Sequence, residues 1–366
     1  MRPLVRGILK GSLKQIRHVT AVPHADAEDL VAQVYDQARR EFGVVAPPLA
    51  LHSPAPVALA ASWLMLRETL LVDGRMSRAA KEAVATGVSE ANECPYCVEV
   101  HRAKLDTLPG GRDDRALGPI ADWARTSAAA APADSAGSAD PAGSAGPAGS
   151  ADPRLPADAA GIAELYGVAV TFHYLNRMVR LFLPDSPVPD AAPAAGRGPV
   201  MRMVARAMRP DSGAPVAAGA SLGLLPAAPL PAGLAWAGAA PAVAEALARS
   251  VASVDAAAER WIPEAVRERL HVELALHQGV VPGPGRAWLA ASSDGLDPAD
   301  LPAARLALLV ALAPYQITDA DLAEFRTAHP GDRELVELAS WAALTAAVHI
   351  GGRFPNPVRP TTSAAR

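Results

Sequence analysis

Apolar residues in this chain recur every three or four positions along a series of segments that Pro- and Gly-rich stretches separate. This spacing is typical of helices that bury one face. Half of the residues are hydrophobic but only 4% are aromatic, so the apolar residues are mainly Ala, Leu and Val. Because such a composition favours helices over sheets, the sequence predicts an all-α fold, a helical bundle.

The length of the chain predicts more than one module. At 366 residues it exceeds the size at which one hydrophobic core keeps growing, so two modules with two cores are expected. Residues 128–156 repeat Ala, Gly, Ser, Pro and Asp, which bury too little surface to offset ordering entropy, and are predicted to be a disordered insertion. The predicted organisation is a first module over 1–183, a linker over 184–199, a second module over 200–354 and a loose tail over 355–366.

Individual helices can be placed from the apolar spacing and from helix-ending residues. Residues 200–235 are weakly patterned and predict no clear helix. The predicted helices span residues 26–42, 56–72, 77–90, 94–108, 113–131 and 159–183 in the first module, and 240–260, 264–278, 285–292, 298–312, 319–328 and 333–353 in the second.

Charge and cysteine usage argue against several classes of protein. A formal net charge of −4, without any Lys/Arg run, offers no field for nucleic acid. Two cysteines three positions apart cannot link distant segments of the chain, so the disulfide framework of a small secreted protein is not expected. The basic N-terminus has no continuous apolar stretch like that of a signal peptide, and no 18 consecutive apolar residues predict a membrane span. We expect a cytoplasmic protein with no nucleic-acid or membrane partner.

The segment around the two cysteines has the features of a helix N-terminus. Pro95 suits a first helical turn, and Asn92 is expected to be the N-cap. Cys94 and Cys97 would then lie in the first turn, where free N–H groups and the helix dipole favour a thiolate.

Two further residues are spaced to join this site. Cys94, Cys97 and His101 fall on one face of a helix, and Glu82 on the preceding predicted helix could reach the same pocket. A carboxylate, an imidazole and a thiol together supply what thiol deprotonation requires.

Glu82, eleven residues, Cys94-x-x-Cys97, three residues and His101 resemble the signature of alkylhydroperoxidase D-like proteins in the carboxymuconolactone decarboxylase superfamily. The resemblance covers residues 25–183 without the insertion, and more faintly 240–354. It implies an all-helical, oligomeric, cofactor-independent and metal-free enzyme that reduces hydroperoxides at the expense of a dithiol or protein thiol. It also implies that Cys97 is peroxidatic and Cys94 resolving, with Glu82 and His101 as the proton relay.

This sequence departs from the best-known members of the family at one position. Tyr96 stands where they carry a histidine between the cysteines, which predicts a weaker relay and lower activity. His173 and Arg177, four residues apart in an apolar predicted helix, are candidates to line the substrate pocket, or else buried polar residues bonded to one another or to backbone.

Other interpretations of the cysteine pair stay open at this point. Cys94, Cys97, His101 and a carboxylate could bind zinc, or the cysteines could be buried and inert. The superfamily also contains decarboxylases, which use acid/base groups without cysteines, and a redox-sensing self-association module is a third possibility.

The second module faintly repeats the first. Arg260-Trp261-Ile262-Pro263 resembles Arg75-Met76-Ser77-Arg78, and Gly285-Arg286-Ala287-Trp288-Leu289 resembles the segment that begins at His101. Residues 279–282 or their neighbours replace the cysteine segment. We therefore expect a duplication whose second copy cannot perform thiol chemistry.

Overall fold

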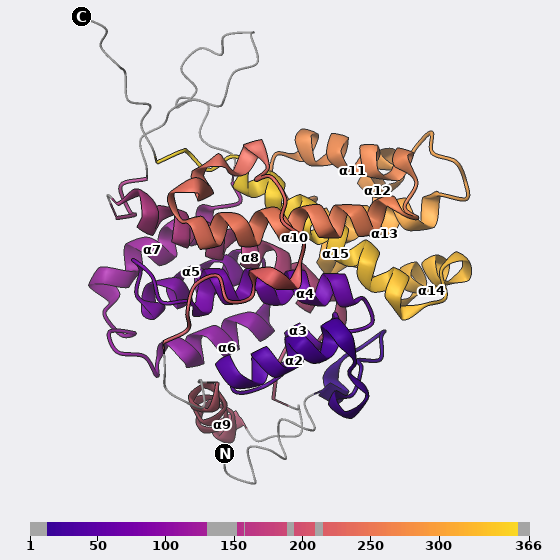
Figure 1. The fold of residues 1–366 in the computed structure, drawn as a ribbon. Coiled ribbons are helices and arrows are strands. Elements are labelled where there is room, and N and C mark those ends of the chain that lie inside the picture. Colours follow the sequence, from indigo (N-terminus) through magenta and orange to yellow (C-terminus); the bar gives the residue numbers. More distant parts are fainter. Residues whose placement is uncertain (1–12, 130–151, 157, 189–193, 209–214, 358–366) are drawn as a thin grey trace, which may run out of the picture.

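A computed structural model of the chain describes residues 13–129, 152–156, 158–188, 194–208 and 215–357. Within these ranges the chain forms helices and no strand, which confirms the all-α prediction (Figure 1). Most of the predicted insertion and of the tail lies outside the described residues. None of the described helices is both long enough and apolar enough to cross a membrane.

The helices of the first half follow the predicted segments closely. The predicted helix 56–72 ends in a turn of π-helix, and a short helix that was not predicted precedes it. The elements are η1 (Leu13–Gln15), η2 (His24–Asp26), α2 (Asp29–Glu41), α3 (Pro47–Ala50), α4 (Pro56–Leu66), the π-helical η3 (Arg67–Leu71), α5 (Arg78–Ala91), α6 (Pro95–Leu105), α7 (Asp114–Thr126) and α8 (Ala159–Phe182).

The second half differs from prediction mainly at its beginning. Helix α9 starts inside the segment predicted as linker and continues into the weakly patterned region. The elements are α9 (Ala194–Ala207), η5 (Leu222–Leu224), η6 (Ala232–Ala239), α10 (Pro241–Glu259), α11 (Glu264–His277), α12 (Ala287–Ser292), α13 (Leu301–Leu312), η7 (Pro314–Gln316), α14 (Asp319–Ala328) and α15 (Asp332–Gly351).

Among the described residues, one hydrophobic cluster includes side chains of both halves, where the sequence analysis expects two cores. Helix α8 packs along α15, and α4 packs along α10, in the middle of the molecule (Figure 1). Small residues permit the close approach: a Cβ at Gly167 would lie 2.6 Å from a methyl of Val243, and one at Gly351 would lie 2.6 Å from a methyl of Val170. The apolar faces of the two halves bury each other, which removes the need for a second core.

The helices around the cysteine segment are fixed by a buried acid at the start of α8. Glu164 accepts hydrogen bonds from the backbone N–H groups of Arg75 and Met76 and forms an ion pair with Lys81 at 3.1 Å. Lys81 also donates to the carbonyl of Val72. These contacts hold the beginning of α5 against α8.

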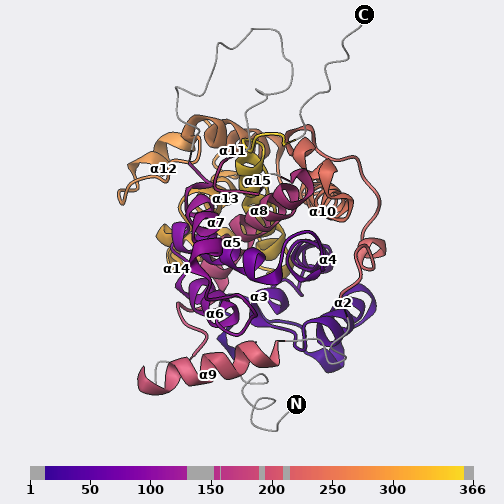
Figure 2. The same cartoon turned by 90° about the vertical axis from the view of Figure 1, so that its left-hand side faces the viewer.

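Helix α9 covers the outer side of α6, at the lower edge of the molecule in Figure 2. A small apolar cluster of Ala103, Val188, Met201 and Ala205 lies between them. Lys104 donates to the carbonyls of Ala205 and Met208 and so holds the C-terminal end of α9.

Candidate functional site

The two cysteines follow a tight reversal of the chain between α5 and α6. Glu93 has a φ of 49°, in the left-handed region, and its N–H bonds to the carbonyl of Glu90. The N–H of Cys94 reaches the carbonyl of Ser89, which completes a Schellman motif with Glu93 where glycine is usual. Pro95 occupies the first turn of α6, as predicted. The reversal places Cys94 at the N-cap of α6 and Cys97 in its first turn, next to the C-terminal end of α5.

Asn92 does not cap α6, so that prediction was wrong. The N-cap position belongs to Cys94, and Asn92 lies at the C-terminal cap of α5. Its side chain turns instead toward α8, where it meets His173 and Asn176.

The two thiols are buried and adjacent. The Sγ atoms of Cys94 and Cys97 are 2.8 Å apart, and the residues are 1% and 5% exposed. Burial and the hydrogen bond with Cys94 raise the pKa of the Cys97 thiol well above its usual range, while Asn176 and Arg180 oppose that rise. Ionisation of Cys97 therefore depends on neighbouring groups rather than on exposure to water.

Glu82 and His101 are brought together as the sequence predicts. The Glu82 carboxylate is fully buried, and its Oε2 lies 2.6 Å from Nδ1 of His101. The His101 ring packs edge-on against Phe172 of α8, with centroids 4.6 Å apart. Contacts from α5 and α8 therefore fix the imidazole on two sides.

Arg78 completes this pair, and the sequence analysis did not identify it. Its guanidinium lies 2.7 Å from Oε1 of Glu82. Burial alone would raise the pKa of Glu82, but Arg78 and then His101 outweigh burial and lower that pKa to about 2. The signal was available, because Arg78 lies four residues before Glu82 on the same helix, at ion-pair spacing.

The ionised carboxylate determines which nitrogen of His101 can act as a base. A carboxylate accepts hydrogen bonds only, so the Nδ1 of His101 is the donor in this contact. A neutral imidazole then carries its lone pair on Nε2. The arrangement leaves Nε2 of His101 as a hydrogen-bond acceptor, while the ionised Glu82 carboxylate holds Nδ1.

The three candidate pocket residues lie in different surroundings. Tyr96 is 4% exposed, and burial raises the pKa of its phenol. His173 contacts Asn92 and Ser127 rather than a cysteine. Arg177 donates to the carbonyl of Ala311 in the second half and to that of His173. The described contacts thus place His173 and Arg177 among buried polar partners.

Asn176 is a second residue of the site that the sequence analysis missed. It lies on α8 three residues after His173, is fully buried, and bonds to Asn92 and Ser89. No local motif marks it, because its relation to the cysteines arises from packing between segments about 80 residues apart.

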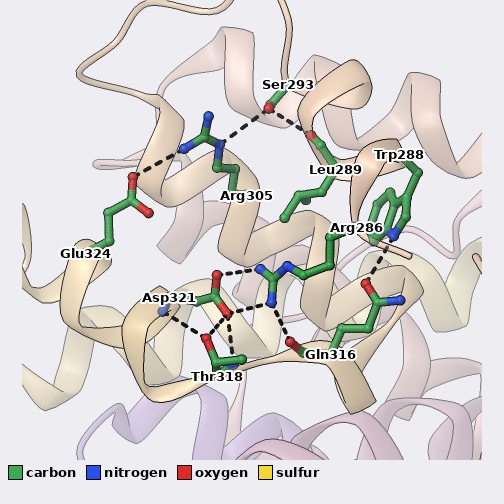
Figure 3. A network of polar contacts seen from close by, with 9 residues as sticks. All are labelled: Arg286, Trp288, Leu289, Ser293, Arg305, Gln316, Thr318, Asp321 and Glu324. Atoms are coloured by element: carbon green, nitrogen blue, oxygen red, sulfur yellow. Dashed lines mark hydrogen bonds and ion pairs between the residues drawn. The ribbon is translucent and has the colours of Figure 1, made fainter. Parts of the chain in front are cut away.

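Residues 285–289, which the predicted duplication pairs with the segment that begins at His101, take part in a different network of polar contacts. Figure 3 shows Arg286 directed at Asp321 of α14, at 2.6 Å, and at the carbonyl of Gln316. The indole of Trp288 donates to the side chain of Gln316. These contacts link α12 to the start of α14 around a Thr318 and Asp321 capping box. Across the described residues, no cluster of three or more His, Cys, Asp and Glu side chains is arranged to hold a metal ion.

Fold and site together define an all-helical protein with a buried cysteine pair beside an oriented imidazole. The chain is 36% identical over 349 residues to the alkyl hydroperoxide reductase Rv2159c of Mycobacterium tuberculosis strain H37Rv, an alignment that covers 93% of this chain and 95% of that protein. The chain therefore belongs to the family of that alkyl hydroperoxide reductase. No family model matches the chain. No solved structure matches it either.

Proposed function

We propose that this protein reduces hydroperoxides with Cys97 as the attacking thiol, Cys94 as the resolving thiol and His101 as the base. The observation that carries the proposal is the contact between His101 Nδ1 and the ionised Glu82, on the helix face that also bears Cys97. The name of the related alkyl hydroperoxide reductase supports the same reaction class.

The first step oxidises Cys97 and reduces the peroxide. Nε2 of His101 accepts the thiol proton, directly or through water, and the thiolate attacks one peroxide oxygen while the O–O bond breaks. Cys97 becomes a sulfenic acid, and the proton held on His101 passes to the departing alkoxide, which leaves as an alcohol.

The second step forms a disulfide between neighbours. The Cys94 sulfur attacks the sulfenic sulfur of Cys97, and the sulfenic oxygen leaves as water after taking up the Cys94 proton. Because the two Sγ atoms start 2.8 Å apart, the S–S bond needs little movement of the backbone. A dithiol or protein thiol then reduces the disulfide by exchange.

Arg78 changes the part that Glu82 plays in this scheme. With Arg78 on one oxygen and His101 on the other, the pKa of Glu82 is about 2, so the carboxylate is a poor final proton acceptor at neutral pH. Glu82 orients the imidazole and stabilises its protonated form, and the proton stays on His101 until the leaving group takes it.

Each cysteine variant serves as the control for the other. With cumene hydroperoxide and dithiothreitol, Cys97→Ser should reduce peroxide consumption to background. In the absence of dithiothreitol, Cys94→Ser should consume one equivalent of peroxide and leave a sulfenic acid that dimedone traps, with the adduct found on Cys97 by mass spectrometry. Full turnover by both variants would overturn the proposal.

A further inference from the structure

A chain of hydrogen-bonded polar side chains, all buried except the half-buried Asn92, extends from Ser89 of α5 toward the C-terminal end of α7. Asn92 donates its amide N–H groups to Oδ1 of Asn176, at 2.9 Å, and toward Nδ1 of His173, at 3.1 Å. Nε2 of His173 lies 2.9 Å from the hydroxyl of Ser127. At the other end, Nδ2 of Asn176 lies 3.0 Å from the hydroxyl of Ser89.

The Ser127 end fixes the direction of the hydrogen bonds in this chain. Ser127 donates its single hydroxyl proton to the carbonyl of Ala124, at 2.7 Å. It must therefore accept from His173, whose proton lies on Nε2, and Nδ1 of His173 must accept from Asn92. Burial lowers the pKa of His173 well below its usual range, which keeps this neutral tautomer.

The Ser89 end fixes the same direction independently. Ser89 donates its hydroxyl proton to the carbonyl of Ala85, at 2.6 Å, and must accept from Asn176. Oδ1 of Asn176 is occupied by the amide of Asn92. Reversing every bond in the chain would sacrifice both serine-to-carbonyl bonds and leave buried groups without partners, which is unfavourable.

The result is an amide with one unused N–H. Nδ2 of Asn176 carries two protons, and Ser89 takes one of them. We propose that Asn176 gives the second to Sγ of Cys97 as a fixed hydrogen bond to the thiolate, with Asn92 and His173 as positioning residues that prevent the amide from turning over. This inference rests on the proposed function and adds to that site a donor for the reacting sulfur.

The electrostatic surroundings of Cys97 agree with a donor in this place. Asn176 is the hydrogen-bonding neighbour that lowers the pKa of Cys97 against the effect of burial. The charged and titratable groups that act on or lie near the sulfur are Cys94, Arg180 on α8 and Tyr96 on α6. His101 lies one turn farther along α6 and is bonded to Glu82 of α5. Arg180 acts on the same sulfur as a cation, whereas Asn176 supplies a directed N–H.

The thiolate itself gives the test, in a Cys94→Ser background where Cys97 is the only thiol. Its ionisation can be followed by thiolate absorbance at 240 nm against pH. Asn176→Leu should raise the midpoint by about one to two pH units, which lowers the thiolate fraction at neutral pH by about tenfold or more. His173→Phe, which removes the partner of Asn92, should raise it by less.

Tyr174→Phe is the matched control, because Tyr174 lies two residues from Asn176 on α8. The variant loses a buried hydrogen bond to Ser340, which is not part of the polar chain described above. Its midpoint should stay unchanged. An unchanged midpoint in folded Asn176→Leu would overturn the inference.

A second measurement is made on the wild-type protein. In the wild-type protein, ¹⁵N NMR of His173 should report the Nε2–H tautomer between pH 5 and pH 8, with the signal assigned by its loss in His173→Gln. An Nδ1–H tautomer would reverse the chain, place the Asn176 oxygen toward Cys97 and refute the proposal. Neither the thiolate titration nor the NMR measurement requires the protein to turn over peroxide. Absence of peroxidase activity would therefore contradict only the proposed function.

Discussion

The reversal between α5 and α6 and the segment between α11 and α12 come after similar helices but have opposite surroundings. The first buries two thiols, with α9 over the outer side of α6. The second leaves Val280 and Val281 in solvent, at 66% and 59% exposure, next to Leu276 near the end of α11, which is 71% exposed. The proposed reactive segment thus differs from the segment that the predicted duplication pairs with it in burial as well as in the identity of its residues.

The scaffold around each segment is more alike than the segments themselves. Glu164 of α8 accepts the backbone N–H groups of Arg75 and Met76, and Glu337 of α15 accepts the indole N–H of Trp261 and pairs with Arg260. These acids lie at the places that the sequence pattern suggests for a duplication. Each half therefore has a buried acid that anchors a neighbouring segment, but only the first half carries cysteines.

The largest expected effect is the loss of the acid that orients the base. Glu82→Gln removes the carboxylate that fixes His101, and peroxide turnover should fall by about 100-fold or more. Steady-state peroxide assays measure it. Glu273→Gln is the control in the second half, since Glu273 is also buried and lies 3.8 Å from His277, and it should leave turnover unchanged. Equal losses in the two variants would mean that Glu82 acts only through the fold.

Acid should destabilise the protein, mainly through two fully buried histidines of the first half. Burial lowers the pKa of His52 to about 4 and that of His173 well below 6.5, so the unfolded chain binds more protons below pH 6.5 and stability falls there. His52 alone should cost about 2 kcal/mol between pH 7 and pH 5. Glu82, with its pKa of about 2, adds a further loss only below pH 4.5.

Urea unfolding at the two pH values measures this acid sensitivity. His52→Phe should flatten the pH dependence of the unfolding free energy, whereas His271→Gln, at a partly exposed position of the second half, should change it little. An unaltered slope in His52→Phe would contradict the assignment.

The smallest expected effect tests whether the halves unfold together. Gly167→Ala would place a methyl 2.6 Å from Val243, between α8 and α10, and should destabilise by about 1–3 kcal/mol. Gly118→Ala meets open space in α7 and should instead stabilise by about 0.5–1 kcal/mol. One cooperative urea transition, shifted in opposite directions, is expected; two separate transitions would argue for independent modules.

Local sequence predicted most of the helices and part of the site. Apolar spacing located α8 and α15 within a few residues, and fixed spacing linked Glu82 to His101. The expectation of two cores differs from the shared cluster of the described residues because length alone does not say whether two apolar faces will cover each other. The N-cap assigned to Asn92 failed because a Schellman reversal through Glu93 placed that side chain against α8.

The sequence by itself determined the helices and the reactive side chains, because spacing along a helix decides which residues share a face. Tertiary structure alone decided how those side chains ionise and which way their hydrogen bonds run. Packing of α8 against α5 and α6 buries Cys97 and places Asn176 and His173 against Asn92, while Arg78 holds Glu82 ionised. These effects depend on burial and on partners distant in sequence, which no local pattern records.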